Sequence, residues 1–281
     1  MTELVGVATV LPMSVLKQQL LIFDRIALGD SALRPNDDQT DADISFLLDA
    51  NVVFALNFRH DAPLTERGRQ QIEETMKHMR ALFSKRIFDS RWMSDDDEEV
   101  QDTLNRFVAI ELREQTNLNA VPIVARWSPV ADQSVTRAEV VQLVISNLPM
   151  PGEDISLEDI LIFRNEMRSL GFIQGLRVWM NDMASGKLTP PEVSDKLEDL
   201  VSRFSRALQL ERMNQESGVV ETLVTTTAEI AESLVKFRWS KLAKKLFDVR
   251  HKQIDLLKAE MTLPGREVAY IAKARERFGA R

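Results

Sequence analysis

Apolar and polar positions divide this chain into two portions with different periodicities. The first portion contains short apolar runs typical of buried strands, in GVATVLP, LIFDRIAL, AVPIVARW and the end of ISFLLDANVVFAL, whose beginning is compatible with a helix. After Pro149 the pattern is almost wholly helical. These patterns predict an α+β fold, with a mixed α/β N-terminal portion at residues 1–150 and a mainly α-helical C-terminal portion at residues 151–281. The two portions join near Pro149 to Gly152, and the pattern allows them to pack either as one compact body or as two.

One segment of the first portion has a clear helical period. In LTERGRQQIEETMKHMRALFSK, apolar side chains recur at Ile72, Met76, Met79 and Phe83. Residues with this spacing lie on one side of a helix, so we predict a helix whose apolar stripe faces a core. The earlier stretch from Leu33 to Asp43 is polar and predicts a loop.

Capping residues mark two helix starts in the second portion. Ser156, with Asp159 three residues later, predicts an N-cap for the helix SLEDILIFRNEMRSL. Thr189, Pro190 and Glu192 predict another start, because proline suits the first helical position and the glutamate can reach back to the cap amide.

The later boundaries of this portion follow from glycine and proline. We expect the helix that starts at Pro190 to end near Asn214, because Gly218 then interrupts the pattern. Two further helices are predicted from Val219 to about Met261. The turn LPGRE then leads into a last helix through AYIAKARERF.

The composition narrows the function classes. With 281 residues, of which 44% are hydrophobic, the chain can bury a substantial core. No window approaches the roughly eighteen apolar residues that span a bilayer, and no leader pattern is present, so we expect no transmembrane segment and a cytoplasmic location. The absence of cysteine excludes disulfides, thiolate catalysis and Cys-type zinc sites, and three histidines leave little material for another metal site. We expect neither a metal nor a cofactor.

The net charge of −7 hides an uneven distribution. From Lys236 to Arg281 there are thirteen Lys and Arg against five Asp and Glu, which gives +8 there and leaves −15 for the first 235 residues. In KFRWSKLAKKLFDVRHKQIDLLK, cations flank an apolar helical seam at Arg238, Lys241, Lys245 and Lys252. These cations predict a face that engages an acidic protein or nucleic acid. The alternatives are that the seam packs in the core while the cations stay solvated or pair with the acidic body, or that the helix lies on a membrane surface.

The stretch FRHDAPLTERGRQQ, residues 58–71, resembles the opening of the histidine phosphatases. That resemblance implies His60 as a phosphoryl acceptor and Arg59 as a phosphate ligand. However, Asp61 stands where the family has glycine, and the late histidine, His251, lies in a helical pattern. A surface turn that leads into a helix explains the same residues.

Other charged groups are weaker candidates. Asp24 interrupts the apolar run LIFDRIAL together with Arg25, either at the edge of an active site or as a structural ion pair that marks the end of a strand. The acidic run SDDDEEVQD lacks the alternation and the glycine of a calcium loop, so it predicts a solvated loop and a negatively charged helix N-terminus. The acidic and basic residues of the helix after Ser156 have the spacing for surface pairs, at Glu158, Asp159, Arg164 and Glu166.

Several phrases resemble a group of uncharacterised bacterial proteins, among them LPMPGEDISLEDILIFR and LPGREVAYIAKARERF. The resemblance implies a shared architecture and a setting in bacterial defence or mobile-element systems. Our first hypothesis is a non-enzymatic binding or assembly protein that engages an acidic partner such as nucleic acid, with homo-oligomerisation left open. The alternatives are a phosphoesterase or nuclease-like hydrolase with a site near His60 or Asp24, and a toxin or defence effector that needs a partner.

Overall fold

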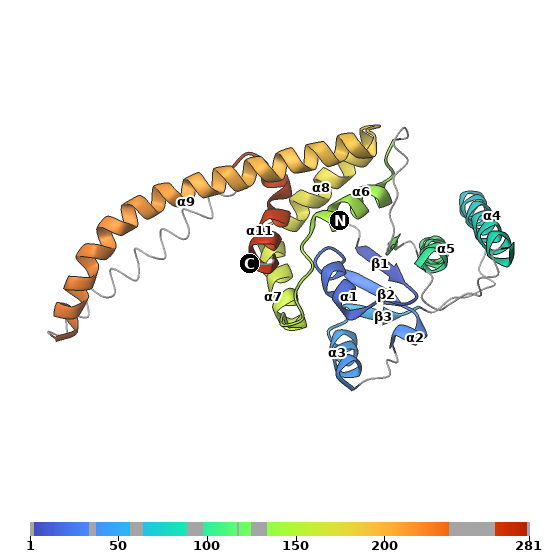
Figure 1. Ribbon diagram of the computed structural model, residues 1–281, viewed down its shortest axis with the longest axis horizontal. Helices are drawn as coiled ribbons and strands as arrows, with labels where there is room; N and C mark the ends of the chain where they lie inside the picture. The colour runs from blue at the N-terminus through green and yellow to red at the C-terminus, as the bar shows by residue number, and fades with distance from the viewer. Residues whose placement is uncertain are drawn as a thin grey trace.

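The computed structural model describes residues 3–33, 38–56, 64–88, 98–116, 118–124, 134–235 and 262–279 (Figure 1). A small parallel sheet with its own helices forms the N-terminal part, and helices alone form the C-terminal part. The predicted α+β fold is therefore confirmed. Among the described residues, no helix has the length and apolar character needed to cross a membrane.

The sheet has four strands, β1 (Leu4–Ala8), β2 (Arg25–Leu28), β3 (Val53–Ala55) and β4 (Asn119–Pro122). Their order is β3-β2-β1-β4, and every pair of neighbours is parallel. The chain thus extends the sheet from β1 to β3 in one direction and then returns to the other side of β1 to add β4. All five residues of β1 are buried, as expected for a parallel strand covered on both faces.

Five helices accompany these strands: α1 (Met13–Gln19), α2 (Asp30–Leu33), α3 (Asp38–Asp49), α4 (Glu66–Phe88) and α5 (Glu98–Thr116). On one face of the sheet, Val5 and Val7 pack with Val108, Ala109 and Leu112 of α5. On the other face, strand residues join the main core together with α1, α3 and the C-terminal helices. Because successive strand side chains point to opposite faces, the two cores divide the strand residues between them.

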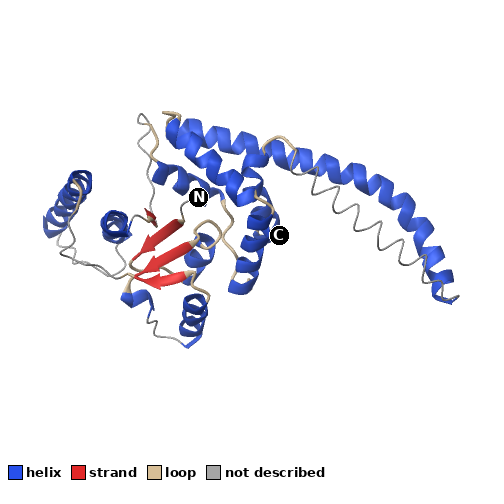
Figure 2. Ribbon diagram, turned by 180° about the vertical axis from the view of Figure 1, so that it is seen from behind, coloured by secondary structure: helices blue, strands red, loops and turns tan. Residues whose placement is uncertain are grey.

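The C-terminal portion consists of α6 (Arg137–Asn147), α7 (Leu157–Ser169), α8 (Phe172–Ser185), α9 (Pro190–Val235), the 3-10 helix η1 (Arg266–Val268) and α11 (Ala269–Phe278). Helices α6 and α8 lie between the sheet and the first part of α9, α11 and α7 lie beside them, and the later part of α9 projects away from the rest of the molecule (Figures 1 and 2). The main core is continuous from Phe23 in the first portion to Tyr270 in the last helix. The boundary near residue 150 stays a prediction.

The predicted helix starts agree with the structure. The backbone N–H of Asp159 donates to the Ser156 hydroxyl oxygen at 3.1 Å. The backbone N–H of Thr189 donates to the Glu192 carboxylate at 2.7 Å. The predicted end of the second helix near Asn214 is wrong, since α9 continues to Val235. A glycine such as Gly218 costs a helix only about 1 kcal/mol, which does not suffice to end it.

Three further predictions for the first portion need correction. The run predicted as a strand from Leu21 forms a strand only from Arg25, because residues 20–23 form the turn that ends α1. The loop predicted up to Asp43 already contains the first turn of α3, which begins at Asp38. The stripe on α4 is only partly in a core: Met79 is buried, but Met76 is 38% exposed. Helix α4 packs mainly against one other helix, α5.

Candidate functional site

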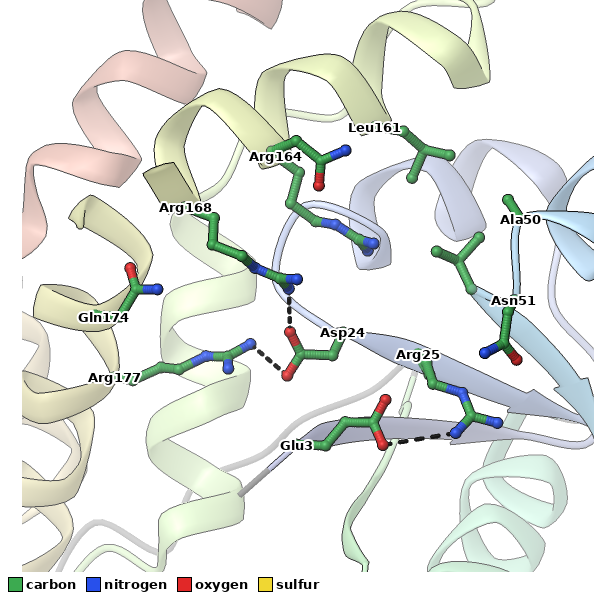
Figure 3. Close-up of a pocket in the computed structure, with 12 residues that line it drawn as sticks. Glu3, Asp24, Arg25, Ala50, Asn51, Leu161, Arg164, Arg168, Gln174 and Arg177 are labelled. Atoms are coloured by element: carbon green, nitrogen blue, oxygen red, sulfur yellow. Dashed lines mark hydrogen bonds and ion pairs between the residues drawn. The ribbon is translucent and has the colours of Figure 1, made fainter. Parts of the chain in front are cut away.

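A cleft of about 660 Å³ opens at the amino end of the sheet, where β1, β2 and β3 begin beside α7 and α8 (Figure 3). Four arginines and two carboxylates line it, which leaves an excess of two positive charges: Arg25, Arg164, Arg168, Arg177, Glu3 and Asp24. The protein as a whole carries a net charge of −7. The cleft is therefore a positive concavity on an acidic molecule.

Asp24 lies at the centre of this arrangement, immediately before β2. One of its carboxylate oxygens accepts from the backbone N–H of Leu4 at 2.8 Å and from Arg177 at 2.8 Å. The other oxygen accepts from Arg168, as the dashed lines of Figure 3 show. Only 13% of the Asp24 side chain is exposed. The aspartate thereby ties the first two strands to α7 and α8.

The charge state of Asp24 follows from these contacts. Burial by itself raises the pKa of the carboxyl group. Hydrogen bonds from Arg177 and from the Leu4 backbone, together with the charges of Arg177 and Arg168, outweigh burial and lower the pKa of Asp24 below its ordinary value. Asp24 is therefore ionised at neutral pH and has no proton to donate as a general acid.

Two of the arginines also hold the end of α1. Arg164 donates to the carbonyl oxygens of Phe23 at 2.8 Å and Leu20 at 3.3 Å, and Arg177 donates to that of Ile22 at 3.4 Å. These carbonyl groups belong to the C-cap of α1 and to the turn that follows it, and buried carbonyl groups need hydrogen-bond donors, which the two arginines supply. Both side chains are buried, which is favourable for arginine only with such partners.

The Tyr270 hydroxyl group is a further donor to the turn after α1. It donates to the carbonyl oxygen of Leu21, next to the carbonyl groups that the arginines hold. Burial raises the pKa of Tyr270, so the phenol stays protonated and keeps its donor. The last helix of the chain is thus fastened to the first.

The other two arginines are more open to the cleft. The side chain of Arg168 is 42% exposed, although it pairs with Asp24. That of Arg25 is 27% exposed, lies 3.6 Å from Glu3, and stacks its guanidinium carbon 4.2 Å above the Phe54 ring. These two side chains present positive charge to a molecule that enters the cleft.

The cleft also contains polar atoms that the protein leaves without partners. Among the described residues, six buried side-chain nitrogen or oxygen atoms have no hydrogen bond, and four of them belong to cleft residues: Arg25, Arg164, Arg177 and Gln174. Each such atom costs about 1–3 kcal/mol when it stays unpaired. In the arginines the unpaired atom is the buried Nε, so these atoms add to the cost of burying the arginines and do not face a molecule in the cleft.

This chemistry suits binding of an anion better than acid–base catalysis. A guanidinium group has five donors in a plane and can serve two acceptors at once, so an added phosphate does not require Asp24 to leave. The one carboxylate at the centre is already held by three donors. Within the described part of the chain, no group of three or more acidic or histidine side chains could hold a metal ion.

The predicted site residues have different outcomes. Asp24 does lie in the cleft, but its partners are Arg168 and Arg177, whereas Arg25 pairs with Glu3. The expected pair between the two neighbours is therefore wrong, because their side chains meet different elements. Arg59 and His60 lie outside the described residues, as do the basic residues Arg238, Lys241, Lys245 and Lys252. A phosphoesterase near His60 and a partner-dependent effector stay predictions.

Two other groups of charges can be placed in part. The acidic run continues into the first turn of α5, where Glu98 and Glu99 stand as predicted for a helix N-terminus, and its residues 94–97 lie outside the described ranges. Arg164 was expected to form a surface pair on its own helix and is instead buried against α1. The reason is that Arg164 lies on the buried face of α7, beside Phe163 and Met167, where the acceptors within its reach are carbonyl oxygens of the turn after α1.

Sequence reasoning missed Arg168, Gln174 and Arg177 as members of one site. The only local signal is that Arg164 and Arg168 are four residues apart and so share a helix face. Nothing in the sequence connects that face to Asp24 or to α8. No family model, curated protein or solved structure matches this chain, so its function must be inferred from its own residues.

Proposed function

We propose that this protein is a non-enzymatic binding protein that holds a phosphate group of nucleic acid in the arginine cleft. The observation that supports this most is the excess of two positive charges in a concave site on a protein of net charge −7. A positive cleft on a protein of net negative charge attracts an anion locally.

Phosphate fits the donors that the cleft offers. Arg168 and Arg25 are the exposed donors, and guanidinium groups bind phosphate oxygens through paired N–H groups. The side chains of Asn51, Asn165 and Gln174 also line the cleft and can donate to sugar or base atoms. The arginines are held in place by Asp24 and by the end of α1, so little side-chain freedom is lost on binding.

The basic C-terminal segment extends this proposal. We propose that Lys241 and Lys245 in this segment bind further phosphates of the same partner. Replacement of both by glutamate is expected to weaken binding, and the weakening is independent of any change in the cleft. The two surfaces can therefore be tested separately.

The cleft is tested by fluorescence anisotropy with a labelled single-stranded oligonucleotide, in a salt series from about 50 to 200 mM, over which phosphate contacts lose strength. Arg168→Gln is expected to raise the dissociation constant about tenfold and to reduce the salt slope by about one, as expected for one lost phosphate contact. Arg25→Gln is expected to act in the same direction.

Arg203→Gln is the matched control, because it removes the same charge from an exposed pair with Asp199 on α9, outside the cleft. Equal losses for Arg168→Gln and Arg203→Gln would mean that only net charge matters, and the cleft would not be the site. No measurable binding by the unaltered protein at the lowest salt would remove the proposal altogether.

A further inference from the structure

The charge of the arginine cleft matches that of a phosphate at the end of a strand. The lining has an excess of two positive charges. A phosphate monoester, such as a terminal phosphate, carries a charge of about −1.5 to −2 at neutral pH. An internal phosphodiester carries a single negative charge. A terminal phosphate therefore neutralises the cleft more completely than an internal phosphate does.

The size of the cleft also favours a strand end. Its volume of about 660 Å³ lies within the range of about 300–1,000 Å³ that is usual for small-molecule sites. Proteins that bind the interior of a single strand use a positively charged groove that follows the backbone over roughly 4–16 nucleotides. A single cleft of this volume accommodates the end of a strand rather than a run of nucleotides.

The two ends of the cleft differ in charge. Figure 3 shows Arg168 and Arg177 at one end, whereas Leu161 and the turn that contains Ala50 and Asn51 form the other end. At the first end, the charge of Arg137 on α6 interacts with that of Arg177, so positive charge continues toward α6. The second end is uncharged.

Acidic residues lie next to the uncharged end. Four lining residues come from α7 and have the spacing of one helix face, namely Leu161, Arg164, Asn165 and Arg168. Glu158 is the next position on this face toward the start of α7, and it is exposed. Asp49, which is also exposed, immediately precedes Ala50. A strand that continued past this end would therefore bring its next phosphate close to carboxylates.

The number of phosphate oxygens leads to the same conclusion. Arg168 and Arg25 have the most exposed side chains of the four lining arginines and come from different elements, α7 and β2. Each guanidinium group can bind two oxygens through paired N–H groups. A monoester offers three terminal oxygens, whereas a diester has only two oxygens outside the backbone. A monoester can therefore serve both arginines at once.

Given the proposed function, in which the cleft holds a phosphate of nucleic acid, we infer that this phosphate is the terminal monoester of a strand. Its oxygens accept from Arg168 and Arg25. The strand leaves the cleft past Arg177 and Arg137, since the opposite end is flanked by carboxylates. No covalent bond is formed or broken.

Four forms of one single-stranded oligonucleotide test this inference, each with a fluorophore on an internal base. They carry a 5′-phosphate, a 3′-phosphate, hydroxyl groups at both ends, or no ends because the strand is a closed circle. Fluorescence anisotropy with the full chain is measured at about 100 mM salt. One phosphorylated strand is expected to bind about tenfold more tightly than the hydroxyl-ended strand, because it makes an additional charge-assisted contact. The circle is expected to bind no more tightly than the hydroxyl-ended strand.

The pH gives an independent readout. A phosphate monoester has a second pKa of about 6, so it loses negative charge between about pH 7.5 and about pH 5.5, whereas a diester does not. The titratable groups among the described residues of the lining are the four arginines, Glu3 and Asp24, with no histidine. The advantage of the phosphorylated strand is therefore expected to shrink over this range. An equal advantage at both pH values would overturn the inference.

Variants locate the effect in the cleft. Arg168→Gln is expected to remove most of the advantage of the phosphorylated strand, and Arg25→Gln tests the same point from the other element, whether or not Arg168→Gln folds. Arg203→Gln, on the exposed surface of α9, is expected to keep the advantage. Replacement of Lys241 and Lys245 by glutamate is expected to weaken all four strands by the same factor.

Failure of this inference can be distinguished from failure of the proposed function. Equal affinities for all four strands would show that the end is not recognised, while nucleic-acid binding itself would stand. No binding of any strand would remove both. A phosphoserine peptide carries the same monoester without a nucleotide and is expected to compete less well than a nucleoside monophosphate, because Asn165 and Gln174 can donate to sugar or base atoms. Equal competition would identify a phosphopeptide as the ligand and overturn the assignment to nucleic acid.

Discussion

Replacement of Asp24 by asparagine removes the one negative charge that Arg168 and Arg177 share. The geometry of the backbone contact is kept, because the asparagine oxygen can still accept from the N–H of Leu4. Both arginines stay near each other without their counter-ion. The change therefore isolates the electrostatic part of the link between the sheet and helices α7 and α8.

The expected cost follows from how deeply the groups are buried. Removal of one partner from a fully buried ion pair costs about 3–5 kcal/mol. Asp24 and Arg177 are 13% and 10% exposed, but Arg168 is 42% exposed and is partly screened by water. We therefore expect Asp24→Asn to lower the free energy of unfolding by about 3 kcal/mol, at the low end of that range.

Urea unfolding followed by circular dichroism at neutral pH measures this loss. Asp199→Asn is the matched control, because Asp199 pairs with Arg203 four residues away on an exposed helix surface, where a pair contributes about 0.5 kcal/mol or less. If the two substitutions cost the same, the reasoning about burial at Asp24 is wrong.

The pH dependence gives a second measurement of the same link. The folded-state pKa of Asp24 is depressed, so its contribution to stability is present above the unfolded-state pKa of about 3.9 and is lost as the pH falls through the lower folded-state value. The difference between the unaltered protein and Asp24→Asn is therefore expected to shrink below about pH 4. A difference that stays constant from neutral pH to pH 3 would contradict the lowered pKa of Asp24.

Binding of oligonucleotide is expected to tighten in Asp24→Asn, because the cleft loses a competing negative charge.

Substitutions at four more positions test the packing and capping of the fold. Gly171 and Gly265 both have φ +79°, but a Cβ at Gly171 would meet nothing within 4 Å, whereas a Cβ at Gly265 would lie 2.4 Å from the carbonyl oxygen of Leu200. In urea titration, Gly171→Ala should lower the free energy of unfolding by about 1 kcal/mol and Gly265→Ala by at least about 3 kcal/mol. Equal losses would refute the steric argument. Tyr270→Phe leaves the buried carbonyl oxygen of Leu21 without its donor and should lower the free energy of unfolding by about 1–2 kcal/mol in the same assay. An unchanged free energy of unfolding would show that this bond does not stabilise the fold. Ser156→Ala removes the cap of α7 and should cost about 1 kcal/mol, whereas Ser156→Thr, which keeps the hydroxyl group that accepts from the Asp159 N–H and donates to the Asp159 carboxylate, should recover most of it.

The helix starts could be predicted because their signals are local. The hydroxyl group of Ser156 bonds a backbone group three residues ahead, and Glu192 reaches three residues back to Thr189. Such contacts are formed by the residues that carry the pattern, so tertiary structure hardly changes them. The end of α9 could not be predicted in this way, because a single glycine is a weak signal and the neighbours of a helix decide whether it continues.

Each of the four predicted strand runs contains a strand, but the predicted boundaries are wrong where an adjoining loop or turn is also apolar: β1 ends at Ala8, before the end of GVATVLP, and β2 begins only at Arg25. Residues 20–23 are buried because they end α1 beneath α7 and α8, and burial alone made them resemble the strand that begins at Arg25. An apolar run cannot distinguish a buried strand from a buried helix end when it is short. Because the turn was taken for a strand, its carbonyl groups could not be predicted as the acceptors of Arg164 and Arg177.

The arginine cleft shows why such a site escapes sequence reasoning even when each residue is visible. Arg164 lies 141 residues after Phe23, whose carbonyl oxygen it holds, and no spacing rule links the two. Arginine has five donors and always carries its charge, so it is stabilised wherever the fold leaves carbonyl groups without partners. Sequence spacing placed Arg164 correctly on a helix and then assigned it to the nearest carboxylates. Arg164 lies instead on the buried face of α7, where the carbonyl oxygens of Leu20 and Phe23 are its acceptors, and Arg168 on the same helix pairs with Asp24 immediately before β2.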